Sequence, residues 1–263
     1  LSTFLLSNYD LVYPTIDGAN RATAGTGINF GSNKTNITIK NFQIRNYQMG
    51  MSIVGRGNLI ENIIANDFGD VNLFYSGVGV SVYGNKNLLK NAFILNGAAE
   101  GIRISGDSNL VQYCKVYCND TINAMEQGNP LTKYGDTDYY IYISANTNTK
   151  QGKYNVVEYC YLERISRRLA HVGHGGHGFS LTISYNHKPC LVGGGYCYDV
   201  TQKDYVVENN IIRNCTTKNV DECVMLRGDK VKYNLIEDVT SLSYGTFRIQ
   251  NSSSYNTFNR CKI

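Results

Sequence analysis

Tryptophan is absent from this 263-residue sequence, and proline occurs only three times. Charged residues make up 17% of the chain, below the quarter that is typical of globular domains. The polarity comes instead from Asn, Ser, Thr, Gly and 21 Tyr residues. This composition favours strands and tight turns over helices.

The sequence has neither a strongly basic region nor a long apolar run. Its formal net charge is only +4 and is dispersed along the chain, which argues against a nucleic-acid partner. No apolar run approaches the roughly 18 residues of a membrane-spanning helix. The first residues, LSTFLLSNYD, lack the charged start of a signal peptide. Because the chain begins and ends within its own repeat, we expect one domain that is a fragment of a longer protein.

Eight cysteines are too few for a disulfide scaffold in a chain of this length. We expect Cys114 and Cys160, at equivalent positions of the repeat described below, to stack in the core. Four others are candidates for disulfides between loops, with a pairing that the sequence does not give: Cys118, Cys190, Cys197 and Cys215. Five glycosylation sequons are about as many as this composition yields by chance: Asn33, Asn36, Asn119, Asn214 and Asn251.

A short motif recurs along the chain: Asn, two apolar residues, then a polar residue. Its copies are NLIEN (58–62), NLLKN (87–91), NLVQY (109–113), NVVEY (155–159), YVVEN (205–209), NLIED (234–238) and NTFNR (256–260), with an earlier NITIK at 36–40. A second motif precedes it, as in GMSIV (50–54), GIRIS (101–105) and TFRIQ (246–250). Its alternation of apolar and polar residues is the pattern of a half-buried strand.

Copies that begin at 36 and 58, at 87 and 109, and at 234 and 256 lie 22 residues apart. The longer spacings are this unit plus loops. A unit so short cannot bury its apolar face alone, whereas stacked coils can. The sequence therefore predicts an all-β fold, a single-stranded right-handed parallel β-helix of about eight coils over residues 1–263. The blades of a β-propeller are too long for this repeat, and a leucine-rich solenoid needs leucine at more fixed positions.

The recurring Asn predicts structure and not chemistry. Asn tolerates the left-handed backbone conformation of turns, and stacked Asn side chains form hydrogen-bonded ladders. A second line of side chains, Glu158, Glu208 and Glu237, is expected at equivalent outward positions. We interpret this line as a solvated edge, with a glycosidase carboxylate pair and a calcium site as alternatives.

Outward positions of the alternating motif should align along the solenoid axis. One line reads Ser52, Ser81, Arg103, Tyr142, Ser180, Met225 and Arg248, and the next reads Val54, Tyr83, Ser105, Ser144, Thr182, Arg227 and Gln250. Arg and Tyr on such a strip suit an acidic polysaccharide, because guanidinium groups bind carboxylates and a tyrosine ring packs against a sugar. A solvated sheet face is the alternative. Long insertions at about 119–138 and 184–204 should flank the strip and turn it into a groove.

Three of the four histidines lie in one glycine-rich stretch, RRLAHVGHGGHGFSLTIS (167–184). The glycines argue against a helical zinc motif. A zinc site in an extended loop, a loop that lines the groove, and a bend with incidental histidines remain as interpretations. We name Arg167, Arg168 and His177 as candidate substrate-binding residues. His171 and His174 are candidate bases, since nearby arginines disfavour the imidazolium form.

The second half of the chain, about 155–261, resembles the polysaccharide lyases of the chondroitinase B and alginate lyase family. In ECVMLR, Glu222 is followed five residues later by Arg227, and in TFRIQ, Arg248 lies 21 residues further on. The family has glutamate, lysine and arginine at this spacing, the arginine within Arg-His-Gly. Here Arg227 replaces the lysine, and Ile-Gln follows Arg248 in place of His-Gly.

The resemblance implies a right-handed parallel β-helix that cleaves a uronate-containing glycan by β-elimination. It implies that Glu222 binds calcium, that Arg248 lies at the leaving oxygen and that Arg227 is the base, a role that arginine is thought to have in the related pectate lyases. A guanidinium loses its proton with difficulty, so His171, His174 and Tyr142 are alternative bases. If the lysine was lost together with catalysis, an arginine-lined binding surface is left.

Three functions therefore stay open, of which we favour the first. This is a secreted or cell-surface lyase that acts on an acidic polysaccharide. The second is a structural glycoprotein of a filament, cell wall or surface coat, which self-associates end to end or side by side through exposed coil edges. The third is a non-catalytic glycan-binding or adhesion domain. Convergence of Arg227, Arg248 and the histidine stretch at one groove distinguishes the first from the others.

Overall fold

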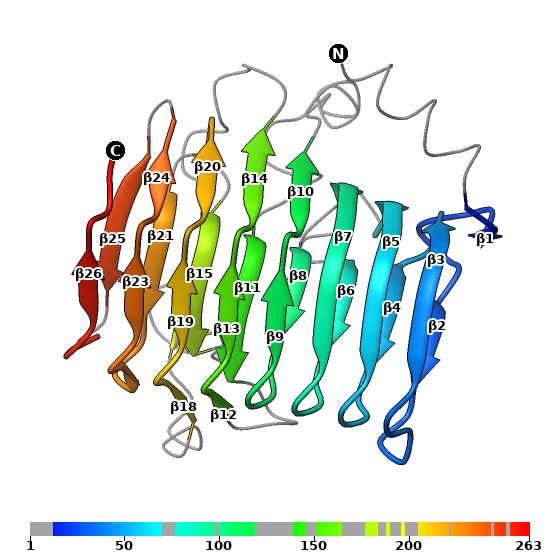
Figure 1. Ribbon diagram of the computed structural model, residues 1–263, viewed down its shortest axis with the longest axis horizontal. Coiled ribbons are helices and arrows are strands. Elements are labelled where there is room, and N and C mark those ends of the chain that lie inside the picture. Colours follow the sequence, from blue (N-terminus) through cyan, green and yellow to red (C-terminus); the bar gives the residue numbers. More distant parts are fainter. Residues whose placement is uncertain are drawn as a thin grey trace.

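The strands of the protein wind into coils that stack along one axis, from the N-terminal coil to the C-terminal coil (Figure 1). The computed structural model describes residues 13–69, 77–97, 100–118, 139–145, 151–164, 177–183, 188–189, 196–197, 205–220, 222–242, 245–250 and 253–263. Within these ranges every strand pairing is parallel except that of β16 (Lys188–Pro189) with β17 (Tyr196–Cys197). The predicted parallel β-helix is confirmed. The two predicted insertions fall almost wholly outside the described residues.

One sheet takes a single strand from each coil, and it has eight strands, which agrees with the predicted number of coils. In spatial order they are β2 (Thr26–Phe30), β4 (Met49–Ile53), β6 (Val78–Val82), β8 (Glu100–Ile104), β11 (Tyr139–Ala145), β15 (His177–Ile183), β21 (Glu222–Arg227) and β25 (Thr246–Gln250). These strands are the copies of the alternating motif. The motif was readable because each strand buries one face against the core.

The copies of the Asn motif form a second, thirteen-stranded sheet, which lies in front of the first in Figure 1. We call its first part, directly after each motif Asn, the proximal half, and the remainder the distal half. The strands β3 (Thr38–Arg45), β5 (Leu59–Phe68) and β7 (Leu88–Gly97) run through both halves. The proximal half continues with β9 (Leu110–Gln112), β13 (Val156–Glu158), β19 (Ile211–Arg213), β23 (Leu235–Glu237) and β26 (Thr257–Asn259). The distal half holds β1 (Thr15–Asp17), β10 (Lys115–Cys118), β14 (Tyr161–Arg164), β20 (Thr216–Lys218) and β24 (Thr240–Ser241).

The predicted Asn ladder is confirmed, and it is buried. In each step the Oδ1 atom of one Asn accepts hydrogen bonds from the backbone N–H and the side-chain amide of the Asn one coil earlier. Asn155 Oδ1, for example, lies 2.9 Å from Asn109 N and 3.1 Å from Asn109 Nδ2, and Asn109 Nδ2 also donates to Gly84 O at 2.9 Å. The ladder runs through Asn58, Asn87, Asn109, Asn155, Asn210, Asn234 and Asn256.

The ladder shows that one copy of the repeat was assigned to the wrong residues. It passes through Asn210 and not through the start of YVVEN at 205, so the true copy is NIIRN (210–214). Residues Val206–Glu208 instead form β18, which pairs with β12 (Gln151–Lys153) and β22 (Val231–Lys232) in a three-stranded sheet. Two similar pentapeptides stand in tandem here, and the one that begins with the motif Asn is the one that joins the ladder.

With this reassignment, Glu158, Glu208 and Glu237 of the predicted line no longer occupy equivalent positions of successive coils. Glu208 pairs in register with Lys153 and Lys232, and its Oε1 atom lies 3.0 Å from Lys153 Nζ. Arg213 occupies the position between Glu158 and Glu237. The outward column of the proximal half therefore mixes charges and reads Lys40, Glu61, Lys90, Gln112, Glu158, Arg213, Glu237 and Asn259. The carboxylate-pair and calcium interpretations of this line are wrong.

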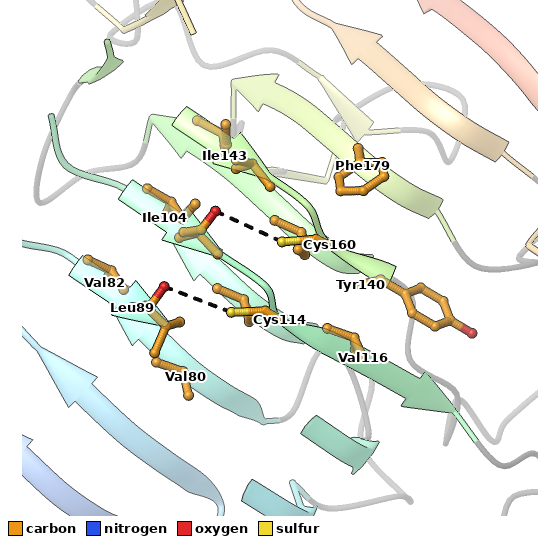
Figure 2. Packing of buried hydrophobic residues seen from close by; sticks show 14 of the residues in the cluster. Val80, Val82, Leu89, Ile104, Cys114, Val116, Tyr140, Ile143, Cys160 and Phe179 are labelled. Atoms are coloured by element: carbon orange, nitrogen blue, oxygen red, sulfur yellow. Dashed lines mark hydrogen bonds between the residues drawn. The ribbon is translucent and has the colours of Figure 1, made fainter. Parts of the chain in front are cut away.

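The core is a stack of aliphatic side chains from all three faces of the coil, and cysteines continue it (Figure 2). The expected stacking of Cys114 and Cys160 is confirmed, with their thiols directed at the carbonyl oxygens of Leu89 and Val111, each at 3.9 Å. Cys215 continues this column as a buried free thiol, so its assignment to a loop disulfide is wrong. The side chains of Cys118, Cys190 and Cys197 are outside the described residues.

Candidate functional site

The outer side of the eight-stranded sheet, which we call the outer strip, has the register that the sequence predicted. Arg103 pairs with Ser81 and Tyr142, and Arg248 pairs with Met225, so both arginines belong to one column. Arg227 pairs with Thr182 and Gln250 in the neighbouring column. Winding of the chain thus brings residues that are more than a hundred positions apart onto one face.

A third column of the outer strip was missed by the sequence analysis. It contains Glu100, Tyr139, His177 and Glu222, each paired with the next. The place of these residues on the strip was missed because one extra residue interrupts the alternation just after each of them. In the coils of Glu100 and His177 this extra residue is a glycine, which is the signal in the sequence that marks the irregularity.

The centre of the outer strip is buried, which differs from the open strip that the alternation suggested. Ser81, Ser105, Ser144 and Ser180 are at most 1% exposed, and Tyr142 is 5% exposed. The hydroxyls of Ser105 and Ser144 lie 2.7 Å apart across neighbouring coils. These four serines and Tyr142 are therefore not accessible to a ligand.

In the fourth strand of the strip, Arg103 is held by groups on three sides. Its Nη2 atom forms an ion pair with Glu100, and its Nη1 atom donates a hydrogen bond to the hydroxyl of Tyr83 at 2.9 Å. The guanidinium carbon lies 5.9 Å from the centroid of the Tyr142 ring, which stacks on Tyr139 at 4.7 Å. Although burial disfavours a charged guanidinium, the charge of Glu100 outweighs it and raises the pKa of Arg103, which fixes the cation.

At the C-terminal end, Arg227 and Arg248 project from neighbouring strands on the same side of the sheet. Arg248 Nη1 forms an ion pair with Glu222, yet the Arg248 side chain remains 49% exposed. Arg227 is partly buried, and among the described residues no acceptor lies within hydrogen-bonding distance of its Nε atom. The two guanidinium groups form a cationic corner, in which the Nε atom of Arg227 is buried.

The two glutamates of the strip are too far apart to act as a pair. Glu100 and Glu222 are separated by three strand spacings, or about 14 Å. Carboxylate pairs of glycosidases lie roughly 5 to 9.5 Å apart. Acid–base hydrolysis by this pair is therefore excluded on geometric grounds.

The donor set around Glu222 does not fit the calcium site that the family resemblance implies. Calcium takes about six to eight oxygen ligands, whereas Glu222 already pairs with Arg248. In the described ranges, no group of three or more His, Cys, Asp or Glu side chains is placed to hold a metal ion. No step below involves a metal.

The histidine stretch is only partly placed. Arg167, Arg168, His171 and His174 lie outside the described residues. The backbone of His177 pairs with Tyr139 on one side and Glu222 on the other, which places it in the middle of the third column. Convergence of the whole stretch with the arginines stays a prediction.

No family model matches this sequence, and no curated protein matches it either. Solved structures with similar folds include a tailspike protein of E. coli bacteriophage HK620 in complex with a pentasaccharide, with a TM-score of 0.51 and 8% identity over 91% of this chain and 46% of the tailspike. An alginate lyase from Paenibacillus sp. str. FPU-7 has a TM-score of 0.46 and 12% identity over 92% of this chain and 80% of the lyase. Pectate lyase Pel9A has a TM-score of 0.38 and 12% identity over 95% of this chain and 71% of that enzyme.

The likeness to the tailspike and the parallel strand pairing agree on the fold: the chain is a parallel β-helix protein. At such low identity the likeness concerns the fold alone. The chain spans a little under half of the tailspike's length. No helix in the described part of the chain is long and apolar enough to cross a membrane.

Proposed function

We propose that this β-helix protein acts outside the cell on an acidic, uronate-containing polysaccharide. The observation that carries the proposal is the cationic corner of Arg227 and Arg248, which share one face of neighbouring strands and remain partly exposed. Guanidinium groups bind carboxylates through paired hydrogen bonds. Arg103, fixed four strands before Arg248 on the same strip, is a further cation for the polymer.

The reaction that we propose is β-elimination. A base removes the proton from the carbon next to the uronate carboxylate. The electron pair forms a carbon–carbon double bond while the bond to the glycosidic oxygen breaks, and that oxygen takes up a proton. Arg227 and Arg248 lower the barrier by neutralising the carboxylate, because negative charge builds up on it in the transition state. His171 and His174 are the proposed bases, with Arg227 as the alternative.

A test for the reaction is the ultraviolet absorbance of the unsaturated product on alginate, pectate and chondroitin or dermatan sulfate. We expect Arg248→Ala to lower the rate by about 100-fold or more, as for loss of one donor to a developing oxyanion. Arg213→Ala is the matched control, since Arg213 is also ion-paired and 43% exposed but lies on the proximal half of the other sheet. Equal effects of the two substitutions, or no product from any polymer, argue against a lyase.

Glycan binding without cleavage is the second candidate, favoured by Arg227 at the position where the similar lyases have lysine. A guanidinium is a poor base. In that case the acidic polymers bind and Arg248→Ala weakens binding, but no unsaturated product appears. Absence of both binding and product removes both candidates.

A further inference from the structure

Five tyrosines adopt a left-handed backbone conformation that bulky residues rarely take. They are Tyr113, Tyr154, Tyr159, Tyr233 and Tyr255, with φ between 55° and 58°. Such a conformation is strained for a residue with a large side chain. Other coils have Gly57, Ser108 or Asn214 at the equivalent positions. The fold therefore accepts smaller residues here, and it does not require tyrosine.

Burial does not explain these tyrosines, because each is between 47% and 72% exposed. Stacking between rings offsets part of the backbone strain at four of the five tyrosines. Tyr113 and Tyr159 stack with ring centroids 5.0 Å apart, and Tyr233 and Tyr255 stack at 5.2 Å. Tyr154 differs, because the equivalent residues of the neighbouring coils are Ser108 and Asn209. No stacked ring in the same column offsets the backbone strain at Tyr154.

All five rings border the same surface, the outer side of the proximal half. Tyr154, Tyr233 and Tyr255 precede the ladder Asn of their coils, whereas Tyr113 and Tyr159 follow the last proximal residue. The surface between the two borders is about five residues, or roughly 16 Å, wide. Because successive coils are in register across it, this surface is flat and rigid.

The surface between the borders has one aliphatic column and one column of mutually compensating charges. One outward column is aliphatic and partly exposed, with Leu110, Val156, Ile211 and Leu235. The charges of the other column compensate each other: Glu158 accepts from Gln112 and forms an ion pair with Arg213 at 2.6 Å, and Glu237 forms one with Arg260 at 3.0 Å. A polyanion finds no free cation in these two columns.

We propose that this tyrosine-bordered surface binds a neutral polysaccharide. A pyranose ring has an apolar face that packs on aliphatic and aromatic side chains, and hydroxyls that bond with phenols and with the exposed edges of the ion pairs. A neutral glycan is favoured over an acidic one by the compensated charges. The surface is separate from the outer strip, so the inference does not depend on the proposed function.

The test replaces all five tyrosines by Asn, the residue that the repeat itself uses at Asn62, Asn91 and Asn214. Binding is measured by calorimetry to soluble neutral polysaccharides, namely laminarin, dextran, hydroxyethyl cellulose and mannan, with alginate for comparison. We expect the variant to retain a cooperative thermal transition, since Asn tolerates this conformation. Affinity for the neutral glycan should fall by about tenfold or more.

Two further variants sharpen the test. Asn214→Tyr adds a ring next to Tyr159 in the same column, and we expect it to strengthen binding of the neutral glycan. Arg248→Ala, on the outer strip, should leave that binding unchanged while it weakens binding of alginate. The binding proposals for the two surfaces can thus be contradicted independently of each other.

The inference is overturned if none of the neutral polysaccharides binds, if the five-fold variant binds them as well as the natural chain does, or if only a protein or alginate competes for this surface. If the five-fold variant does not fold, the single substitution Tyr154→Asn replaces it in the test, because it removes no ring from a stacked pair of tyrosines. A roughly twofold loss of affinity is then expected. An unchanged affinity contradicts the proposal.

Discussion

Individual asparagines have two distinct roles in this protein. The ladder residues, such as Asn109 and Asn155, are buried and satisfy backbone and side-chain groups of two coils at once. The left-handed positions lie beside them, at residues such as Asn91 and Asn214, which are exposed. From the sequence we expected one residue to do both. The structure separates the roles because a residue that points into the core has to keep an extended backbone to stay in the strand.

Loss of a ladder side chain should cost more than loss of a turn side chain. Asn155→Ala leaves the backbone N–H and the amide of Asn109 without their acceptor and removes the donor to Gly106 O. We expect the free energy of unfolding to fall by about 2 to 3 kcal/mol, the cost of buried groups without partners. Asn91→Gly, at an exposed left-handed position, should change it by less than about 0.5 kcal/mol. Urea denaturation measures both, and similar losses would contradict the separation of roles.

In several strands of the eight-stranded sheet, a glycine allows neighbouring coils to approach. A Cβ atom on Gly101 would lie 2.5 Å from Tyr140 O and 2.6 Å from Val116 Cγ1. The same position in neighbouring coils is Gly50 and Gly79, with equally close contacts. The extra residue at this position, Gly101 after Glu100 and Cys223 after Glu222, shifts the alternation, and it is why the two glutamates were not assigned to the outer strip from the sequence. The positions beyond it, including Arg103 and Arg248, were predicted correctly because alternation resumes there.

Gly101→Ala should therefore destabilise the protein through a clash with backbone. We expect a loss of about 2 kcal/mol in the free energy of unfolding, typical of overpacking in a rigid core. The control is Gly25→Ala, because a Cβ atom there meets nothing within 4 Å. This control should shift the stability by no more than about 0.5 kcal/mol. Thermal unfolding of the two variants separates them, and a neutral Gly101→Ala would show that the coils can move apart.

At the scale of the whole molecule, stacking makes each coil depend on its neighbours. The column of Cys114, Cys160 and Cys215 runs through three coils in the middle of the chain, and all three thiols are buried and free. Burial raises the pKa of the Cys160 and Cys215 thiols well above the usual value, which removes the reactive thiolate at neutral pH.

These thiols report on cooperative opening of the solenoid. We expect a water-soluble thiol reagent to leave Cys114, Cys160 and Cys215 unmodified in the folded protein and to label the three together as urea unfolds it. Cys261, in the last coil and partly exposed, should react before these three. Mass spectrometry of the labelled peptides measures the order. Labelling of Cys160 alone under native conditions would show that single coils open independently.

The sequence by itself determined the parallel β-helix, the number of coils, the Asn ladder and the columns that hold Arg103, Arg227 and Arg248. It did so because stacking imposes one repeat on every coil, and a repeat is visible in one dimension. Only the tertiary structure decided that the centre of the outer strip is buried, that Glu222 pairs with Arg248, and that Arg213 and not Glu208 stands between Glu158 and Glu237. Burial and ion pairing depend on which side chains meet across coils, and the order of residues along one coil does not give these contacts.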